Sequence, residues 1–439
     1  MAVNNIDIKR CLNRLPQQLK ELIHLASNLA SRKNMAVYLV GGFVRDLILG
    51  VKNFDLDIVV EGDGIKFAER LSDILKAKLI CHHRFGTATV TLDNNFKVDI
   101  ATARKEVYPK PATLPLVTPG SLKDDLFRRD FTINAMAISI NKNNFGKLID
   151  FYDGKKDLFE RKIRILHNLS FIDDPLRMLR GIRFEKRYHF TIEPNTLRCL
   201  KEAAGKRMLL KVQPHRIRDE LILILKEEHP LELLRRIQKL LTLEFIHPYL
   251  HISRDDYNLF KEIERQISWF KHTYPHFKQL DRWLIYFIGV VDDLALKTVK
   301  SICRKFAFSR SDTQRILSYK TIALRHIRRL KNSRLEPYVL YNFFKPLSYE
   351  IILMIKARYR HKNIQKHIRS FLDNYSGMRL YINGDALLKL GIPPGPLYKK
   401  IFREVFKAKL SGLISSKKEE LTLVKNLIVK IGLKDKIKL

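Results

Sequence analysis

Two aspartates, Asp55 and Asp57, stand on either side of Leu56, directly before the apolar run at 58–60. Successive side chains of a strand point to opposite faces, so a strand here places both carboxylates on one face and Leu56 on the other. Two carboxylates on one face repel each other unless a cation lies beside them, and hard oxygen ligands suit Mg²⁺. A solvated turn would also explain an isolated Asp-x-Asp pattern, so the neighbouring residues decide between the two readings.

A candidate phosphate site precedes the aspartates. The stretch YLVGGFVRDLILG at 38–50 is typical of a strand, a turn at Gly41 and Gly42, and a short helix that ends at Gly50. Backbone N–H groups at a helix start bind phosphate when no side chain is in the way. Arg45, in the first turn, would add a forked donor to the same anion. A Gly-Gly turn, an arginine and an Asp-x-Asp strand together predict a site for a metal-bound triphosphate.

A third carboxylate, Asp99, follows on another expected strand. The runs TATVTL and FKVDIA flank Asp93-Asn94-Asn95 and predict a β-hairpin whose second strand carries Asp99. In two-metal phosphoryl transfer such a carboxylate helps to activate an attacking hydroxyl. A strand-end aspartate that hydrogen-bonds to the backbone would give the same pattern, and both interpretations stay open.

A second set of candidate residues repeats every three positions in FIDDPLRMLRGIRFEKR, residues 171–187. Asp174, Arg177, Arg180 and Arg183 would form one slowly rotating stripe on a helix. An Asp–Arg ladder on a solvated surface has the same spacing and is worth only a few tenths of a kcal/mol per pair.

The chemistry of an aspartate beside an arginine also suits recognition of a base. Cytosine and adenine both present an amino donor beside a ring acceptor. A carboxylate that accepts from the amino group and a guanidinium that donates to the ring nitrogen can therefore read both bases. Guanine and uracil have the reverse order and are rejected, with about 1–3 kcal/mol of discrimination per bidentate contact.

Two kinds of element must position these residues. Up to about residue 165 the chain mixes strand-like runs with turns, as in AVYLVGG, LDIVV, FTINAMAISI and KLIDFYD. From about residue 170 the pattern is helical almost throughout. Within residues 171–187 a helix is expected, with Pro175 compatible with its first turn and Asp173 or Asp174 as its cap. A small α/β domain followed by a long all-helical region is predicted.

Composition narrows the class of protein and its partners. The 439 residues suit two to four domains, and 82 Lys and Arg against 46 Asp and Glu give a formal net charge of +36. Such an excess favours a polyanion as partner, although a general lysine bias on solvated helices would produce it too. No apolar window is long enough for a membrane span, no signal peptide is recognisable, and the four cysteines form no CxxC pair. A cytoplasmic protein without a disulfide framework or zinc site is expected.

The motifs resemble, in order, those of one known family. GGFVRD, FDLDIV and RRDFTINAMA at 128–137 are similar to the polymerase-β-type nucleotidyltransferase head of class II tRNA nucleotidyltransferases. These are the CCA-adding enzymes, whose sister group is bacterial poly(A) polymerase. The ordered motifs cover roughly residues 35 to 225, and a weaker likeness, INGDALLKLGIPPGP, follows at 382–396.

The resemblance implies roles for individual head residues. Gly42, beside Gly41, and Arg45 match positions that bind the triphosphate. Asp55 and Asp57 match ligands of Mg²⁺. Arg129 matches a nucleotide-contacting residue, and Asn134 lies where the same motif lines the ribose side.

The resemblance also covers the helical region. Residues 173–177 resemble the family's EDxxR motif, with Asp173 in place of glutamate, so Asp174 and Arg177 are expected to select the base. Arg180 and Arg183 are expected to approach the nucleotide. Two further motifs are expected to act structurally: Asp153, Gly154 and Asp157 as a hinge, and Arg216 with Glu220 as support, where His215 replaces a frequent glutamate.

The resemblance predicts an α+β chain with four parts. These are a nucleotidyltransferase head at 1–165, a helical neck for base recognition at 166–245, a helical body at 246–345 and a tRNA-binding tail at 346–439. Basic helical stretches at 319–334 and 356–371 could follow the RNA backbone, which duplex RNA presents for phosphate and shape recognition. Generic solvated helix faces would look the same.

The expected activity is template-independent addition of C and/or A, from CTP and ATP, to the 3′ end of tRNA. Pyrophosphate leaves in line as the tRNA hydroxyl attacks. The motifs do not distinguish a full CCA-adding enzyme from a CC-adding or A-adding specialist. The proline-rich segment at 104–122 corresponds to the family's flexible region associated with the switch from C to A. A poly(A) polymerase and an inactive RNA-binding homologue are the remaining alternatives.

Overall fold

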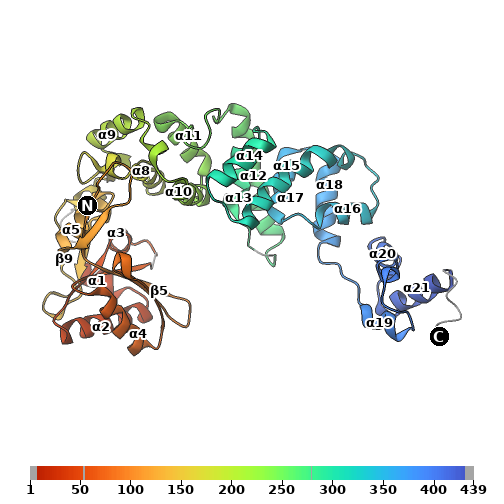
Figure 1. The fold of residues 1–439 in the computed structure, drawn as a ribbon, viewed down its shortest axis with the longest axis horizontal. Coiled ribbons are helices and arrows are strands. Elements are labelled where there is room, and N and C mark those ends of the chain that lie inside the picture. Colours follow the sequence, from red (N-terminus) through yellow and green to blue (C-terminus); the bar gives the residue numbers. More distant parts are fainter. Residues whose placement is uncertain (1–6, 53–54, 278, 431–439) are drawn as a thin grey trace. The chain divides into compact units, whose positions relative to one another are not determined.

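The computed structural model describes residues 7–52, 55–277 and 279–430, apart from the side chains of 323–326. Positions 53 and 54 of the Gly-Gly to Asp-x-Asp stretch therefore lie outside the described residues. The chain divides into two compact units, Met1–His251 and Ile252–Leu439. Among the described residues every strand belongs to the first unit, and the second is built of helices (Figure 1). The expected α+β fold is confirmed, and the four-part division stays a prediction.

A seven-stranded mixed sheet forms the centre of the first unit. Its strand order is β3-β4-β5-β2-β1-β8-β9, in which β2 and β5 run parallel and the other neighbours antiparallel. The strands are β1 (Ala36–Val40), β2 (Leu56–Glu61), β3 (Lys78–His82), β4 (Thr87–Thr91), β5 (Lys97–Thr102), β8 (Met136–Ser139) and β9 (Leu148–Asp150). The expected hairpin is the pair β4–β5.

The two faces of the sheet differ in their cover. The face that carries Leu56 and Ile58 is buried under α4 (Gly64–Leu75), which packs on β2, β3, β4 and β5. On the opposite face, Val59 and its neighbours pack against α5 (Leu122–Phe127). This second face also carries Asp57, because strand side chains alternate. Leu56 is therefore buried on one face of the sheet, and Asp57 lies on the other face, as the sequence predicts.

Short helices complete the head. They are α1 (Ile8–Asn13), α2 (Gln17–Arg32), α3 (Gly42–Leu49) and three single turns, η1 (His83–Phe85), η2 (Thr132–Asn134) and η3 (Lys142–Asn144). Strands β6 (Arg104–Val107) and β7 (Leu116–Pro119) form a separate antiparallel hairpin within the proline-rich segment. The run FTINAMAISI is a strand only from Met136; its first residues form η2, where Asn134 hydrogen-bonds Asp130.

The rest of the first unit is mainly helical. Its elements are α6 (Gly154–Phe159), β10 (Lys162–Ile163), α7 (Ser170–Asp173), α8 (Leu176–Arg187), β11 (Thr191–Ile192), α9 (Pro194–Gly205), η4 (Met208–Lys211), α10 (Pro214–Lys226) and α11 (Pro230–Leu241). As expected, the helix that carries the arginines starts after Pro175, with the Asp174 carboxylate accepting from the Leu176 N–H at 3.3 Å; a separate short helix, α7, precedes it. Asp174 has an extended backbone between them, because a proline disfavours helical geometry in the residue before it.

The described part of the second unit consists of helices. They are α12 (Arg254–Thr273), α13 (Arg282–Val290), α14 (Leu296–Lys305), α15 (Arg310–Leu330), α16 (Pro337–Phe344), α17 (Tyr349–Arg358), α18 (Lys362–Ser370), the π-helical turn η5 (Phe371–Tyr375), α19 (Gly384–Lys389), α20 (Pro396–Leu410) and α21 (Lys417–Lys430). Helix α17 packs against α12 and α13, and the last three helices share their own cluster of buried aliphatic residues. None of the described helices is long and apolar enough to cross a membrane.

Candidate active site

One cavity of the first unit collects most of the expected site residues. Its volume is about 580 Å³, and its lining comes from α3, β2, the β6–β7 hairpin, η2, α8 and α10. The expected residues that line it are Gly42, Arg45, Asp55, Asp57, Arg129, Asn134, Asp174, Arg177, Arg180 and Arg183. Gly41 and Asp99 are not in the lining, but each is adjacent to a residue that is. Residues far apart in the sequence therefore meet at one site.

Asp57 is the carboxylate at the base of this cavity. It is half-buried on β2, whereas Asp55 is exposed just before the strand. Burial raises the pKa of Asp57 to about 6; Arg129 opposes the rise, and Asp99 and Asp55 add to it. A cation placed beside the carboxylates would remove both the burial penalty and the repulsion. The pair therefore fits a divalent cation.

Asp99 lies on β5 directly opposite Asp57 in the parallel register. Its carboxylate is exposed and accepts a hydrogen bond from the Thr89 hydroxyl at 2.6 Å. The position suits a third active-site carboxylate, and the hydrogen bond suits the alternative interpretation as a structural residue. The role of Asp99 stays a prediction.

The Gly-Gly turn brings no side chain of its own between Asp57 and the neighbouring arginines. Gly41 has φ +70°, in the left-handed region that favours glycine. A Cβ there would collide with the guanidinium of Arg129 and would lie 3.6 Å from an Asp57 carboxylate oxygen. Gly42 opens α3, which ends at the left-handed Gly50 as the sequence predicts. The absence of side chains at the two glycines thus makes room for the guanidinium groups of Arg129 and Arg45 beside Asp57 and the helix start.

Arg45, on that helix, belongs to a buried network that extends across the cavity wall. Its Nε donates to Asp46 at 2.8 Å and a terminal nitrogen donates to the Asn134 side-chain oxygen. The Asn134 amide donates to Asp130 at 2.9 Å, and Asp130 also accepts two hydrogen bonds from Arg180 at 2.6 and 2.8 Å. The phosphate-side and base-side arginines are thereby linked through one carboxylate.

Asp130 is ionised because of these partners. Burial alone would raise its pKa, but the charge of Arg180 and hydrogen bonds from Asn134 and Arg180 outweigh it and lower the pKa to about 2. The residue is 8% exposed. The sequence analysis missed it, although it directly follows the arginine pair of RRDFTINAMA.

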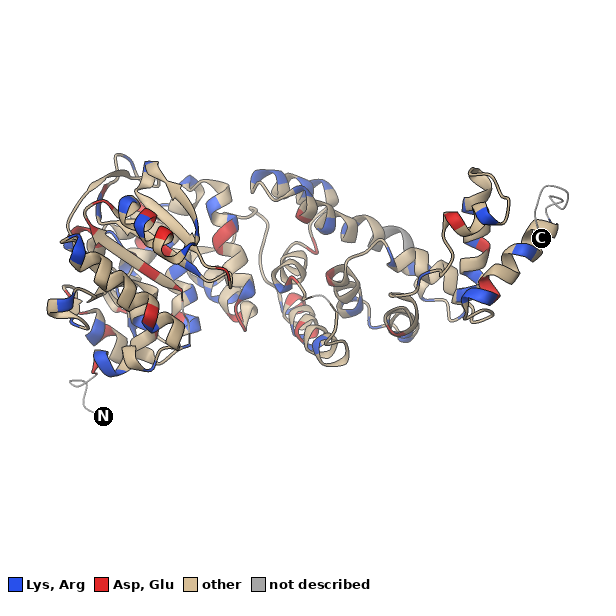
Figure 2. Ribbon diagram, turned by 90° about the horizontal axis from the view of Figure 1, so that it is seen from below, with Lys and Arg blue, Asp and Glu red and all other residues tan. Residues whose placement is uncertain are grey.

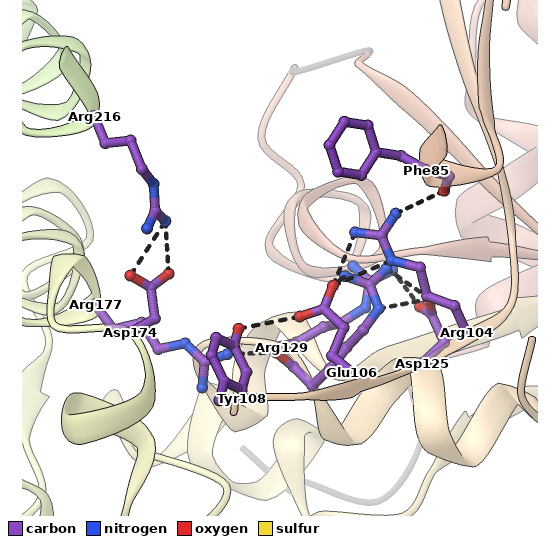
Figure 3. A network of polar contacts seen from close by, with 10 residues as sticks. Phe85, Arg104, Glu106, Tyr108, Asp125, Arg129, Asp174, Arg177 and Arg216 are labelled. Carbon is purple, nitrogen blue, oxygen red and sulfur yellow. Dashed lines mark hydrogen bonds and ion pairs between the residues drawn. The ribbon is translucent and has the colours of Figure 1, made fainter. Parts of the chain in front are cut away.

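The residues expected to select the base form the opposite wall. The Asp174 carboxylate accepts from Arg216 at 3.0 and 3.2 Å (Figure 3). Arg177 is buried and donates to the Ser170 hydroxyl at 2.7 Å and to the Arg128 carbonyl at 2.6 Å. The Asp174–Arg177 pair is therefore held in place before any ligand binds. Arg216, expected only as support, also reaches the cavity lining.

A buried glutamate holds the last arginine of the stripe. Glu220 on α10 accepts from Arg183 Nε at 2.6 Å and lies 3.9 Å from Arg180. The side chains of Arg183 and Glu220 are 6% and 3% exposed, so this is not a surface ladder. The expected supporting role of Glu220 agrees with this contact.

The β6–β7 hairpin contributes a polar cluster that sequence reasoning missed. Glu106 accepts from Arg104 at 2.9 and 3.1 Å, from Arg128 at 3.2 Å and from the Tyr108 hydroxyl at 3.1 Å (Figure 3). Burial, with the neighbouring Glu106 charge, raises the pKa of Tyr108. Arg104, Glu106 and Tyr108 alternate along β6 and its end, a local spacing that the sequence analysis did not use, whereas Arg128 comes from a distant part of the chain.

Comparison with known proteins agrees with the geometry of the site. The family model described as poly A polymerase head domain matches residues 37–164, and that described as probable RNA and SrmB-binding site of polymerase A matches 189–253. An A-adding tRNA nucleotidyltransferase of Halalkalibacterium halodurans is 31% identical over 91% of this chain and 91% of its own length. The chain belongs to the tRNA nucleotidyltransferase family. The expectation from the sequence motifs is confirmed.

Other members of the family differ in length and in the nucleotides that their names say they add. The A-adding enzyme of Geobacter sulfurreducens is 34% identical over 96% of this chain, which spans 49% of that relative. The chain likewise spans 41% of the relative from Aquifex aeolicus. Among solved structures, a Thermotoga maritima CCA-adding enzyme complexed with tRNA is 33% identical, with a TM-score of 0.70 over 96% of this chain and 99% of that one. Family members are generally metal-dependent nucleotidyltransferases.

The donor set of the cavity fits such a metal. The described residues contain no group of three or more His, Cys, Asp or Glu arranged to hold an ion, so a metal here would have two protein ligands. Asp55 and Asp57 would supply two oxygen ligands and leave the other positions to water and phosphate. Mg²⁺ usually binds in this way, through one or two carboxylates.

Proposed function

We propose that this protein is a template-independent tRNA nucleotidyltransferase that adds C and/or A from CTP or ATP to the tRNA 3′ end. One observation supports this most strongly. A single cavity joins the Asp55–Asp57 carboxylates, the Gly42–Arg45 helix start and the Asp174–Arg177 pair. These are the parts needed for a metal, a triphosphate and a base.

The proposed metal is Mg²⁺, held by Asp55 and Asp57. When bound, it neutralises the triphosphate and stabilises the charge that develops during phosphoryl transfer. Asp57 binds it in the ionised form, and the low exposure of Leu56 on the other face fixes the strand that presents the carboxylate.

The remaining residues position the substrates. The backbone N–H groups of the Gly41–Gly42 turn and the guanidinium of Arg45 orient the phosphates. Asp174 accepts from the amino group of cytosine or adenine and Arg177 donates to the neighbouring ring nitrogen. Because the protein already holds these groups by hydrogen bonds, little reorganisation is needed when the tRNA hydroxyl attacks the α-phosphate and pyrophosphate leaves.

Nucleotide choice has two candidate outcomes. Three relatives that are 31–34% identical are A-adding enzymes, which favours a specialist that extends tRNA ending in CC. Structures of CCA-adding enzymes with ATP and with CTP, at 33% and 32% identity, favour addition of all three nucleotides. The Asp174–Arg177 pair suits both bases.

Single-nucleotide incubations test the proposal. The protein with Mg²⁺ is given tRNAs that end before the first C, before the second C or before the A, each with one labelled nucleotide. A specialist extends only the last tRNA with ATP, or only the first two with CTP, and a CCA-adding enzyme extends all three. Long adenylate tails without preference for tRNA would indicate a poly(A) polymerase. No incorporation under any condition would leave an inactive RNA-binding homologue.

A further inference from the structure

Four apolar residues of the cavity lining bind neither the metal, the triphosphate nor the incoming base in the proposed function. They are Phe85, from the turn between β3 and β4, with Leu114, Pro115 and Val117 of the β6–β7 hairpin region. We call these four residues the apolar lip. The rest of the lining is dominated by arginines and carboxylates, which recognise phosphates and hydrogen-bonding base edges. An apolar surface in such a cavity suits the flat face of a base.

The backbone of Phe85 is fixed from both sides. Its carbonyl accepts from Arg104 at 3.0 Å, and Arg104 is itself held by Glu106. The next residue, Gly86, has φ +60° and accepts at its carbonyl from the Thr102 amide at 2.8 Å. The turn that carries Phe85 is thus anchored to the end of β5, the strand that carries Asp99, and to Arg104 of β6.

The ring of Phe85, in contrast, is partly exposed and makes few contacts. The side chain is among the exposed large hydrophobic residues, at 40%. Among the described residues its one recorded ring contact is the Arg84 guanidinium at 5.6 Å. In Figure 3 the ring points away from the Arg104–Glu106 cluster. A fixed backbone with a free aromatic face is a pre-organised stacking surface.

The position of the ring indicates which base it meets. The incoming base is assigned to Asp174 and Arg177 on the helical wall, and its phosphates to α3. Phe85 comes instead from the sheet, beyond the strand whose Asp99 is paired with Asp57. The hydroxyl that attacks must reach Asp57 from a direction that the incoming nucleotide does not occupy. The sheet side, with the apolar lip, offers that space.

We infer that Phe85 stacks on the last base of the RNA that is being extended, and so positions its 3′-hydroxyl. This inference rests on the proposed nucleotidyltransferase function and adds a substrate contact to it. Aromatic stacking holds single-stranded bases without regard to sequence. That property suits a terminus whose last base changes with each addition.

Steady-state kinetics with matched variants test the inference. Phe85→Ala and Phe85→Leu should each raise KM for RNA about ten-fold, because stacking of one base is worth about 1–3 kcal/mol. Phe85→Trp should stay within about two-fold of the parent, since it keeps the aromatic face. The dissociation constant for nucleotide without RNA should not change. Phe151→Ala is the control, because Phe151 is a 49% exposed aromatic of the same head outside the cavity.

Full activity of Phe85→Leu would overturn the inference, because leucine fills space but cannot stack. A rise in KM for the nucleotide instead of the RNA would also overturn it and would assign the ring to the incoming base.

A binding measurement separates this inference from the proposed function. RNA with 2-aminopurine as its last base should lose fluorescence on binding the parent protein, and markedly less on binding Phe85→Ala at saturation. A probe within the stem should report no difference between the two proteins. Equal quenching at the terminus would refute the stacking contact even if the enzyme is active. Quenching without any nucleotide incorporation would support the contact and refute the proposed activity.

Discussion

The cavity of the first unit and the basic stretch at 356–371 of the second use positive charge differently. In the cavity, Arg183 and Glu220 form an ion pair whose side chains are 6% and 3% exposed. In the basic stretch, Arg369 pairs at 3.6 Å with Asp373, just beyond its end, and the two side chains are 67% and 41% exposed. Lys and Arg recur over the helices of both units (Figure 2), so their number alone does not distinguish the two regions.

The difference is one of pre-organisation. A buried ion pair holds its guanidinium in one orientation, and removing one partner leaves a charge uncompensated. An exposed pair is worth about 0–1 kcal/mol and can exchange its carboxylate for a phosphate. We therefore expect the cavity to determine chemistry and nucleotide choice, and the basic helices to contribute affinity that depends on salt.

Fewer basic side chains of this stretch are free to contact RNA than its sequence indicates. Lys356 donates to Gln365 and lies over the Trp269 ring, and Arg358 pairs with Asp292 at 2.9 Å. Lys362 and Lys366 are exposed on α18. Lys362 and Lys366 therefore remain candidates for contact with RNA, whereas Lys356 and Arg358 already have partners within the protein.

The largest effect is expected at the metal carboxylates. Asp57→Asn should lower the rate of nucleotide addition about a thousand-fold, because the pre-organised charge that stabilises the transferring phosphate is lost. Single-turnover addition to tRNA at saturating nucleotide measures this. Asp93→Asn, at an exposed carboxylate of the β4–β5 turn, should leave the rate unchanged. A fall of less than ten-fold in Asp57→Asn would place the metal elsewhere.

Changes to the Asp174–Arg177 pair should affect the choice of nucleotide more than the rate of nucleotide addition. Asp174→Asn should reduce discrimination between C or A and the rejected bases by about 10- to 100-fold, because the amide replaces an acceptor with a donor. Ratios of kcat/KM for ATP, CTP, GTP and UTP measure this. Asp219→Asn is a matched change on α10 at a 61% exposed side chain. Unchanged ratios in Asp174→Asn would assign base recognition to other residues.

The carboxylate that joins the two walls should affect stability with a defined pH dependence. Asp130 has its pKa lowered to about 2 in the folded protein, against about 3.9 in unfolded chains. Because the pKa is lower in the folded state, the ionised Asp130 stabilises the folded protein at pH values above its unfolded pKa. This contribution is lost as the pH falls toward 2. Asp130→Asn should therefore cost about 2 kcal/mol of unfolding free energy near neutral pH and much less near the folded pKa.

Denaturant unfolding at several pH values checks this prediction. A parent–variant difference that is equal at all pH values would show that the charge of Asp130 is not what stabilises the network.

The smallest effect is expected on α18. Replacing Lys362 and Lys366 with alanine should weaken tRNA binding several-fold and lower the slope of log affinity against log salt by about one to two, as two phosphate contacts are lost. The same change at the exposed Lys297 and Lys300 of α14 is the comparison. Identical slopes for both pairs would mean that net charge, not the position of α18, governs the interaction.

Local features of the site could be predicted from the sequence, and long-range contacts could not. The common face of Asp55 and Asp57 follows from strand alternation, and the helix start at Gly42 follows from the glycine pair. The contact of Asp174 with Arg216 joins positions 42 residues apart, so it depends on how α8 and α10 pack. Asp130 carried a local signal within its motif, but its role as a link depends on Arg180 from another element.

One expectation was only partly right. The sequence analysis gave Asp174 two places, on the helical stripe with the three arginines and as a cap of the helix, and the structure has it before the helix. Pro175 disfavours helical geometry at Asp174, and in this position the carboxylate lies beside Arg216.

A crystal structure with Mn²⁺ and a non-hydrolysable CTP or ATP analogue tests the central claim most directly. The account predicts an anomalous peak within coordination distance of both Asp55 and Asp57, with the triphosphate along the start of α3 and the base against Asp174 and Arg177. A peak and a nucleotide bound away from these two carboxylates would contradict it.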